Sequence, residues 1–202
     1  MTDPAFVVLL PVKPPVRGKS RLDVDPERRR RLAAAFALDT AHACLSARSV
    51  VAVLAVTDDA SFAADLRAAG CDTIPDGVAD DLNESLRQAA AEAFRRWPGT
   101  VPVALCADLP ALAADDLDTA LGSVTGPAFV ADHDGVGTTL YTAPYDVFSP
   151  AFGHGSRSAH LAHGALEIEG PLLTLRQDVD DAAALSGAES LGLGAHTRLA
   201  LL

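Results

Sequence analysis

The stretch VVAVLAVTDDASFAADLRAAG, residues 50–70, decides the fold. Its first seven residues are all apolar and mostly β-branched, which is typical of a strand covered on both faces of a sheet. We expect Thr57 or Asp58 to cap a helix that begins at about Ala60, and Gly70 to end that helix. A buried strand followed at once by a helix indicates a parallel sheet, because parallel strands need a crossover between them.

Four further apolar runs repeat this alternation of strand and helix along the chain. Asp25 is a suitable N-cap for the longest helix, and Pro26 suits its first turn. The sequence predicts strands at residues 5–12, 50–56, 71–75, 101–106 and 127–131, and helices at residues 26–48, 60–69, 82–96 and 114–123. We therefore expect an α/β fold, with a mostly parallel, doubly wound sheet sandwiched by helices.

The pattern changes after residue 131. This last third is expected to decorate the edge of the sheet and to supply one wall of a cleft. No linker rich in Pro, Gly or Ser and no internal repeat occurs, so we expect a single domain over residues 1–202. The elements expected here are an extended segment through Thr142, a loop at 152–160 with a short helix from Ser158, an extended segment at 172–179 and a short helix at 180–191.

The overall composition argues against several classes of protein. A net charge of −11 and a pI near 4.8 argue against binding to nucleic acids or anionic membranes. The apolar runs are shorter than the ~18 residues of a membrane-spanning helix. Asp3 stands where a signal peptide would have cations, so we expect a cytoplasmic protein. The three cysteines form no CxxC pair, so neither a disulfide framework nor a zinc site is expected.

The stretch LLPVKPPVRGKSRL, residues 9–22, concentrates four cations in this acidic chain, directly after the first strand. Lys13, Arg17 and Lys19 can neutralise phosphate oxygens, and Gly18 lets the backbone approach them. A solvated surface segment is the alternative interpretation. The stretch matches neither the Walker A pattern nor GxGxxG, which disfavours P-loop NTPases and dinucleotide-binding proteins.

Three aspartates are candidate metal ligands. Asp108 follows the strand at residues 101–106, and ligands of open parallel sheets bind at the carboxyl ends of strands. Asp178 and Asp180 alternate in the stretch RQDVDD, so both can face one ion if that stretch is extended. A nucleoside triphosphate beside carboxylates requires a divalent cation such as Mg²⁺. Each aspartate alone is more often a cap or a solvated charge.

The stretch FGHGSRSAH, residues 152–160, offers a second anion site. Gly153, Gly155 and Ser156 supply backbone and hydroxyl donors in a form that suits a phosphate or a carboxylate. One further polar residue stands out, because Asp39 falls on the apolar face of the first helix. We interpret it as a buried structural carboxylate paired with a loop cation, with an active-site role as the alternative.

Five stretches resemble, in this order along the chain, the guanylyltransferases of deazaflavin coenzyme F-420 biosynthesis, which use 2-phospho-L-lactate or phosphoenolpyruvate. They are the basic stretch LLPVKPPVRGKSRL, then ADLPAL, GVGTTL, FGHGSRSAH and LRQDVDD. The resemblance covers nearly the whole chain, from about Val8 to Leu185. This chain has GVADDLN where the family usually has a glycine-rich run before its LN pair, and GTT where the family has GTN.

The resemblance implies a fold of the nucleotide-diphospho-sugar transferase type, which is a Rossmann-like sandwich. It also implies an enzyme that moves GMP from GTP to a small phosphorylated carboxylic acid with release of pyrophosphate. The oligomeric state stays open between monomer and homodimer. The residues implied are Lys19, Arg17 and Asp108 for catalysis, Lys13, Gly18 and Asn83 for GTP, Thr138, Gly153 and Ser156 for the acceptor's phosphate, and Asp108 with Asp178 or Asp180 for Mg²⁺.

Several alternatives stay open at the level of the sequence. The acceptor is phosphoenolpyruvate, 2-phospho-L-lactate or 3-phospho-D-glycerate, which differ by a few atoms. Another nucleotidyltransferase, using CTP or a molybdopterin-type acceptor, would have a similar first loop and strand-end aspartate. A non-catalytic nucleotide-binding module would bind GTP without releasing pyrophosphate.

Overall fold

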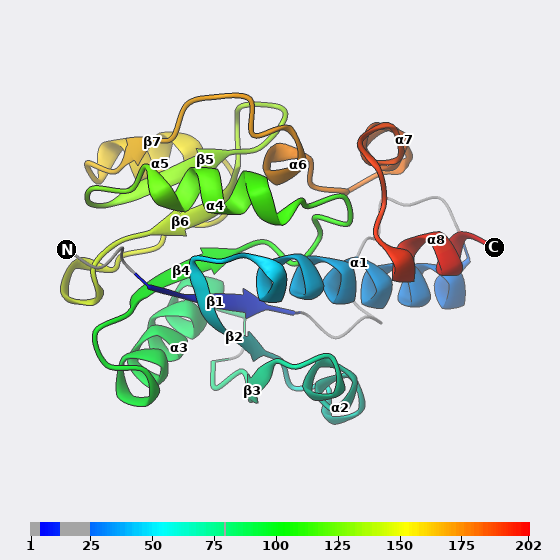
Figure 1. Ribbon diagram of the computed structural model, residues 1–202, viewed down its shortest axis with the longest axis horizontal. Helices are drawn as coiled ribbons and strands as arrows, with labels where there is room; N and C mark the ends of the chain where they lie inside the picture. The colour runs from blue at the N-terminus through cyan, green and yellow to red at the C-terminus, as the bar shows by residue number, and fades with distance from the viewer. Residues whose placement is uncertain (1–4, 13–24, 79) are drawn as a thin grey trace.

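The computed structural model describes residues 5–12, 25–78 and 80–202 of the chain. Its strands form one seven-stranded sheet in the order β3-β2-β1-β4-β6-β5-β7, flanked by helices (Figure 1). The predicted α/β fold class is confirmed. The strands are β1 (Phe6–Pro11), β2 (Val50–Val56), β3 (Asp72–Ile74), β4 (Val101–Leu105), β5 (Ala128–Ala131), β6 (Thr138–Thr142) and β7 (Leu166–Glu167).

Helices cover both faces of this sheet. Val8 and Leu10 of β1 pack in the cluster that contains α1, α2 and α4, whereas Val7 and Leu9 pack in the cluster that contains α3. None of the helices in the described part of the chain combines the length and the hydrophobicity that crossing a lipid bilayer requires. The helices are α1 (Pro26–Ser46), α2 (Ala60–Ala68), α3 (Leu82–Arg96), α4 (Ala114–Gly122), η2 (Tyr145–Val147), α5 (Ser156–Ala162), α6 (Leu173–Arg176), α7 (Ala182–Leu191) and α8 (Ala195–Leu201).

The position of strand β6 shows that the place expected for the last third of the chain is wrong in part. It lies between β4 and β5 and is antiparallel to both, while the other described pairs are parallel. All five of its residues are buried, as suits an interior strand. The last third therefore contributes to the interior of the sheet as well as to its edge, where β7 lies.

The helix caps follow the local sequence closely. Asp25 caps α1 and accepts hydrogen bonds from two backbone N–H groups of its first turn. The cap of α2 is Asp59, whose carboxylate accepts from the N–H of Phe62 at 2.9 Å. The expectation of Thr57 or Asp58 is thus wrong by one or two residues.

The two residues expected as this cap have other bonds. The N–H of Thr57 donates to the carbonyl of Ile74, which extends the pairing of β2 with β3. The carboxylate of Asp58 accepts from the N–H of Asp76, which fixes the chain after β3. Both partners are distant in sequence, so local pattern alone could not reveal them.

Two further expectations are wrong in part. Strand β2 is fully buried only over Val53–Val56, and Val51 is 54% exposed. The segment at 172–179, expected to be extended, contains the helical turn α6. Asp116 of α4 accepts hydrogen bonds from both the N–H and the hydroxyl of Thr174, and this long-range contact favours the helical turn.

Helix α8 packs against α1 and was not predicted (Figure 1). The buried carboxylate of Asp39 accepts hydrogen bonds from the N–H groups of His196 at 3.0 Å and Thr197 at 2.8 Å, at the start of α8. This contact supports the structural interpretation of Asp39, although its partners are backbone N–H groups rather than a loop cation. Such bonds satisfy donors that a helix start leaves unpaired.

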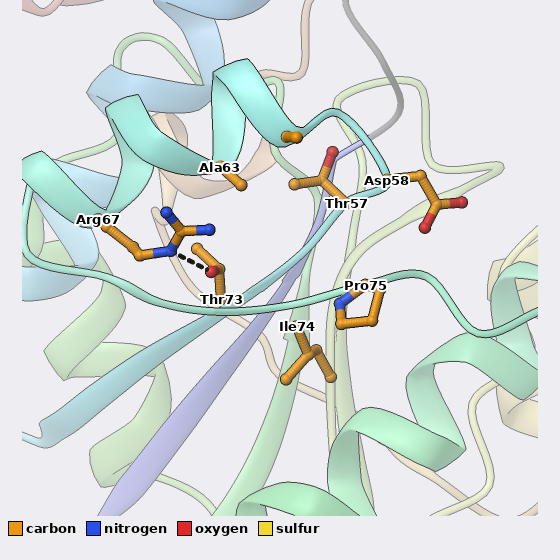
Figure 2. Close-up of a pocket in the computed structure, with 8 residues that line it drawn as sticks. Thr57, Asp58, Ala63, Arg67, Thr73, Ile74 and Pro75 are labelled. Carbon is orange, nitrogen blue, oxygen red and sulfur yellow. Dashed lines mark hydrogen bonds between the residues drawn. The ribbon is translucent and has the colours of Figure 1, made fainter.

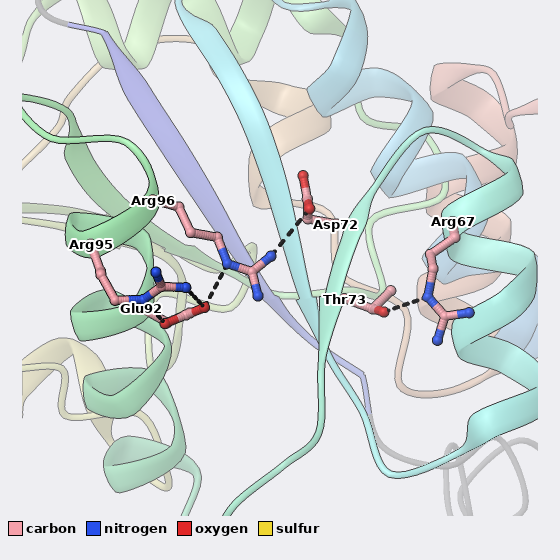
Figure 3. Close-up of polar contacts among 6 residues, drawn as sticks. All are labelled: Arg67, Asp72, Thr73, Glu92, Arg95 and Arg96. Carbon is pink, nitrogen blue, oxygen red and sulfur yellow. Dashed lines mark hydrogen bonds and ion pairs between the residues drawn. The ribbon is translucent and has the colours of Figure 1, made fainter.

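Strand β3 is short and is held from both faces of the sheet (Figure 3). Arg96 of α3 bonds to Asp72 at 3.1 Å and to Glu92 at 2.6 Å. On the other side, Arg67 of α2 donates to the hydroxyl of Thr73 at 2.7 Å. These side chains fix the edge strand beside β2.

Candidate active site

Three aspartates converge near the carboxyl end of β4. Asp108 follows this strand, and Asp178 and Asp180 follow α6; one carboxylate oxygen from each lies within 4.8 Å of the others. Asp108 and Asp178 are half-buried, and Asp180 is exposed. The structure thus brings together three residues that the sequence predicts as metal ligands, while their role as ligands stays a prediction.

The backbone holds this cluster together. The N–H of Val179 donates to the carbonyl of Asp108 at 3.0 Å. Val179 is fully buried in a small apolar cluster with Phe36 of α1 and Ala188 of α7. Its side chain therefore points into the core, and the aspartates on either side of it lie toward Asp108.

Thr40 of α1 fixes the other segment of the cluster. Its hydroxyl accepts a hydrogen bond from the N–H of Leu109 at 3.1 Å and lies 3.3 Å from the carbonyl oxygen of Ala107. The same hydroxyl is 2.8 Å from the carbonyl oxygen of Phe36 in its own helix. Thr40 thus holds Leu109, the residue after Asp108, against α1. Nothing in the sequence indicates this role, since a threonine inside a helix is common.

The chemistry of the three carboxylates fits Mg²⁺. Mg²⁺ prefers oxygen ligands and usually takes one or two protein carboxylates together with waters and phosphate oxygens. Within the described residues, this is the one group of His, Cys, Asp or Glu side chains placed closely enough to hold a metal ion. Its partial exposure leaves room for ligands from a substrate.

The predicted triphosphate-binding residues Lys13, Arg17, Gly18 and Lys19 lie outside the described residues. Strand β1, which precedes them in the sequence, pairs in parallel with β4, which precedes Asp108. Their contact with a triphosphate, and with the aspartate cluster, stays a prediction.

A second group of candidate residues gathers where β6 meets α5. Thr138 begins β6 and Ser156 begins α5, and both are buried. The N–H of Arg157 donates to the carbonyl of Val136, which joins the two segments. The hydroxyl of Thr138 lies 3.1 Å from Nδ1 of His160, a second link between β6 and α5.

Gly153 shapes the loop that enters α5. Its φ of 143° lies in the region that favours glycine, and its carbonyl accepts from the N–H of Ser156. A Cβ at this position would meet no atom within 4 Å, so the backbone conformation alone favours glycine here. Gly153 and Ser156 therefore lie in one tight turn, and their role in holding an anion stays a prediction.

Asn83 connects α3 to the same loop. Its side-chain amide donates to the carbonyl of Phe152 at 2.9 Å, and its carbonyl oxygen accepts from the N–H of Phe152 at 2.8 Å. The sequence predicts that Asn83 helps to seat the nucleotide, and that role stays a prediction. The contact observed is with the residue before Gly153.

A pocket of about 260 Å³ lies at the ends of β2 and β3, against α2 (Figure 2). Arg67 and Thr73, which bond to each other, line it together with Thr57 and Pro75. No residue that the sequence predicts for the site lines this pocket, and it shares no residue with either group described above.

Comparison with known proteins decides the family. No protein-family model matches the chain. A phosphoenolpyruvate guanylyltransferase from Thermomonospora curvata is 46% identical over 196 residues, covering 94% of this chain and 86% of the relative. Another, from Streptomyces scabiei, is 42% identical over 205 residues, covering 96% and 95%. This chain belongs to the phosphoenolpyruvate guanylyltransferase family.

Solved structures place this guanylyltransferase family member in a wider fold group. A structure assigned to the nucleotide-diphospho-sugar transferases, from Desulfovibrio desulfuricans, has a TM-score of 0.62 and 17% identity, and covers 92% of this chain and 96% of its own. A nucleotidyl transferase from Methanothermobacter thermautotrophicus has a TM-score of 0.63 and 15% identity, covering 93% and 97%. The predicted nucleotide-diphospho-sugar transferase type of fold is confirmed.

Proposed function

We propose that this protein transfers GMP from GTP to the phosphate of phosphoenolpyruvate and releases pyrophosphate. Membership of the phosphoenolpyruvate guanylyltransferase family supports the reaction. The structural observation that carries the proposal is the convergence of Asp108, Asp178 and Asp180 within 4.8 Å. A cluster of carboxylates at the end of a strand suits a metal-bound nucleotide.

The bond changes of the transfer are simple. An oxygen of the acceptor's phosphate forms a bond to the α-phosphorus of GTP, and the bond from that phosphorus to the oxygen that bridges to the β-phosphorus breaks. The acceptor is already an anion at neutral pH, so no strong general base is needed. The main obstacle is repulsion between two anions, which positive groups and positioning must overcome.

Cations of the basic stretch are assigned to the triphosphate. The sequence places Lys13, Arg17 and Lys19 directly after β1, in a chain whose net charge is −11. Lysine and arginine side chains neutralise phosphate oxygens and orient them by charged hydrogen bonds. Without such groups the acidic protein would repel GTP.

We assign Mg²⁺ to Asp108 together with Asp178 or Asp180. When bound there, the ion would neutralise phosphate charge that builds up during transfer. The protein's own contribution is to hold the carboxylates in place. It does so through the hydrogen bond between Val179 and Asp108 and through the hydroxyl of Thr40.

We assign the phosphorylated acid to Thr138, Gly153 and Ser156. A hydroxyl on β6 and the turn that enters α5 then face one anion from two sides, and the bond between Arg157 and Val136 keeps these segments together. Asn83 holds the same turn from α3 through both of its hydrogen bonds to Phe152.

An assay of pyrophosphate release tests the reaction. The enzyme would be incubated with Mg²⁺, with GTP or CTP, and with phosphoenolpyruvate, 2-phospho-L-lactate or 3-phospho-D-glycerate. We expect the fastest release with GTP and phosphoenolpyruvate. Equal release with CTP would contradict the assignment of the nucleotide, and binding of GTP without any release would indicate a non-catalytic module.

A further inference from the structure

His160 is a titratable side chain with an unusual environment. It is fully buried, and its ring stacks on Tyr141 with centroids 4.6 Å apart and on Phe129 at 5.5 Å. The ring of Phe152 meets it edge-on at 5.5 Å. Aromatic groups thus surround the imidazole, and its two nitrogens are its only means of polar contact.

The backbone fixes which ring nitrogen carries the hydrogen. The N–H of Ala151 donates to Nε2 of His160 at 3.0 Å. A backbone N–H can only donate, so Nε2 must be the unprotonated acceptor and Nδ1 must carry the hydrogen of the neutral ring. Burial, reinforced by nearby His163 and opposed by a hydrogen bond with the backbone of Ser156, lowers the pKa of His160 to about 4. The ring is therefore neutral at pH 7.

A β-bulge brings Thr138 to this ring. The pairing of β5 with β6 runs regularly until Leu140 and then shifts, so that Ala131 pairs with Thr138 and Thr139 is the extra residue. In a regular strand the side chain of Thr138 would share a face with Leu140. The bulge instead turns it to the face of Tyr141, where His160 lies.

We propose that His160 is a positioning residue that sets the hydroxyl of Thr138 as a hydrogen-bond donor to the anionic acceptor. The same Nδ1–H that meets the backbone of Ser156 also donates to Oγ1 of Thr138, across 3.1 Å. Because the hydroxyl accepts from the ring, its own hydrogen must point elsewhere. Among the described residues, His160 is the only hydrogen-bond partner of this hydroxyl, so the hydrogen of the hydroxyl is available to an oxygen of the bound acid. This inference rests on the proposed function, which assigns the acid to Thr138.

The tautomer can be measured in the unmodified protein. Long-range ¹H–¹⁵N spectra of ¹⁵N-histidine-labelled protein distinguish a protonated Nδ1 from a protonated Nε2, and the His160→Asn spectrum assigns the signal. We expect a neutral ring with hydrogen on Nδ1 at pH 7. A ring protonated on Nε2 would overturn the proposal, because Thr138 would then donate to the histidine.

Two isosteric variants separate positioning from packing. In His160→Asn the amide nitrogen takes the place of Nδ1 and can still donate to Thr138. In His160→Gln the amide oxygen takes the place of Nε2 and can still accept from Ala151, but the donor to Thr138 is lost. We expect the KM for phosphoenolpyruvate to rise about 10-fold more in His160→Gln than in His160→Asn, with the KM for GTP unchanged in both.

Calorimetry gives a readout that does not need turnover. Phosphoenolpyruvate would be titrated into each protein with Mg²⁺ and a GTP analogue that has a methylene group between its α- and β-phosphorus. We expect the same order of affinities, with wild type and His160→Asn tighter than His160→Gln. Equal affinities in the two variants would overturn the inference. Phosphoenolpyruvate binding by the wild type without pyrophosphate release from GTP would instead contradict the proposed function.

Discussion

The N–H of Val179 donates to the main-chain carbonyl of Asp108 across 3.0 Å, and this bond joins the two segments that carry the aspartate cluster. Asp178 and Asp180 flank the donor, so one backbone contact sets the position of both carboxylates relative to the third. The side chains of the aspartates take no part in this bond. Changes to their carboxylates should therefore leave this bond in place.

Asparagine at position 108 should remove metal binding and retain the fold. We expect Asp108→Asn to weaken binding of Mn²⁺, measured by the loss of the free-ion signal in electron paramagnetic resonance, by about 10-fold or more, because a charged ligand is lost. Its thermal unfolding should stay close to that of the wild type, since the carbonyl that accepts from Val179 remains.

Asp178→Asn and Asp180→Asn, tested in the same way, show which of the two completes the site. Asp65→Asn is the matched control, because Asp65 is an exposed acid on α2 away from the cluster. Wild-type affinity in Asp108→Asn would rule out Asp108 as a ligand.

Valine at position 138 should impair use of the acceptor. We expect Thr138→Val to raise the KM for phosphoenolpyruvate about 10-fold, because the hydroxyl that donates to the anion is lost, and to leave the KM for GTP unchanged. Thr142→Val is the control. Thr142 is equally buried in β6 and donates to the carbonyl of Pro102. Loss of the Thr142 hydroxyl should lower the stability of the protein without changing either KM. A KM effect of the same size in Thr142→Val would contradict the role of Thr138.

How much the sequence could predict depends on the range of the interactions involved. Helix α3 and strand β2 were located to the residue, because apolar runs, caps and breakers lie within the elements themselves. The interior place of β6 could not be foreseen, since strand order depends on pairing with β4 and β5. Helix α8 was missed because Asp39, which caps it, is 157 residues away from His196.

The candidate site shows the same limit. Asp108, Asp178 and Asp180 were identified from their positions at the ends of strands and in an alternating stretch, and the structure brings them together. His160 was not identified from the sequence, because its partners Thr138 and Ala151 come from β6 and from the loop before α5. The bulge that turns Thr138 toward it leaves no signal in the sequence.

Alanine at position 194 should destabilise the protein. A Cβ on Gly194 would overlap the carboxyl group of Asp39, which is bonded to the start of α8. We expect Gly194→Ala to lower the free energy of unfolding by about 2 kcal/mol, as is typical when extra atoms enter a packed site. Gly122→Ala is the control, since a Cβ there meets nothing within 4 Å at the end of α4. Equal stability of the two variants in chemical denaturation would contradict the role of Asp39 as a cap.

Asp118 should make stability depend on pH in the acid range. Burial alone would raise the pKa of Asp118, but hydrogen bonds from Ser49 and Arg48 outweigh it and lower the pKa to about 2, from an ordinary value of 3.8. A carboxylate with a lowered pKa stabilises the fold above its unfolded pKa and loses that contribution as pH falls to the folded pKa. We expect Asp118→Asn to be less stable than the wild type by at most about 2 kcal/mol at pH 7.

The difference between wild type and Asp118→Asn should shrink as pH falls from about 4 to about 2. Urea unfolding at a series of pH values measures it. A difference that stays constant through this window would show that the charge of Asp118 does not stabilise the contact with Ser49 and Arg48.

The most direct test of the proposed reaction is ³¹P NMR of GTP, phosphoenolpyruvate and Mg²⁺ mixed with the protein. With the wild type we predict that pyrophosphate and a new pair of coupled diphosphate resonances, from GMP joined to the acceptor's phosphate, appear in equal amounts, and that Asp108→Asn yields neither. Unchanged GTP and phosphoenolpyruvate with the wild type, or breakdown of GTP to GMP without the joined product, would contradict the proposed transfer.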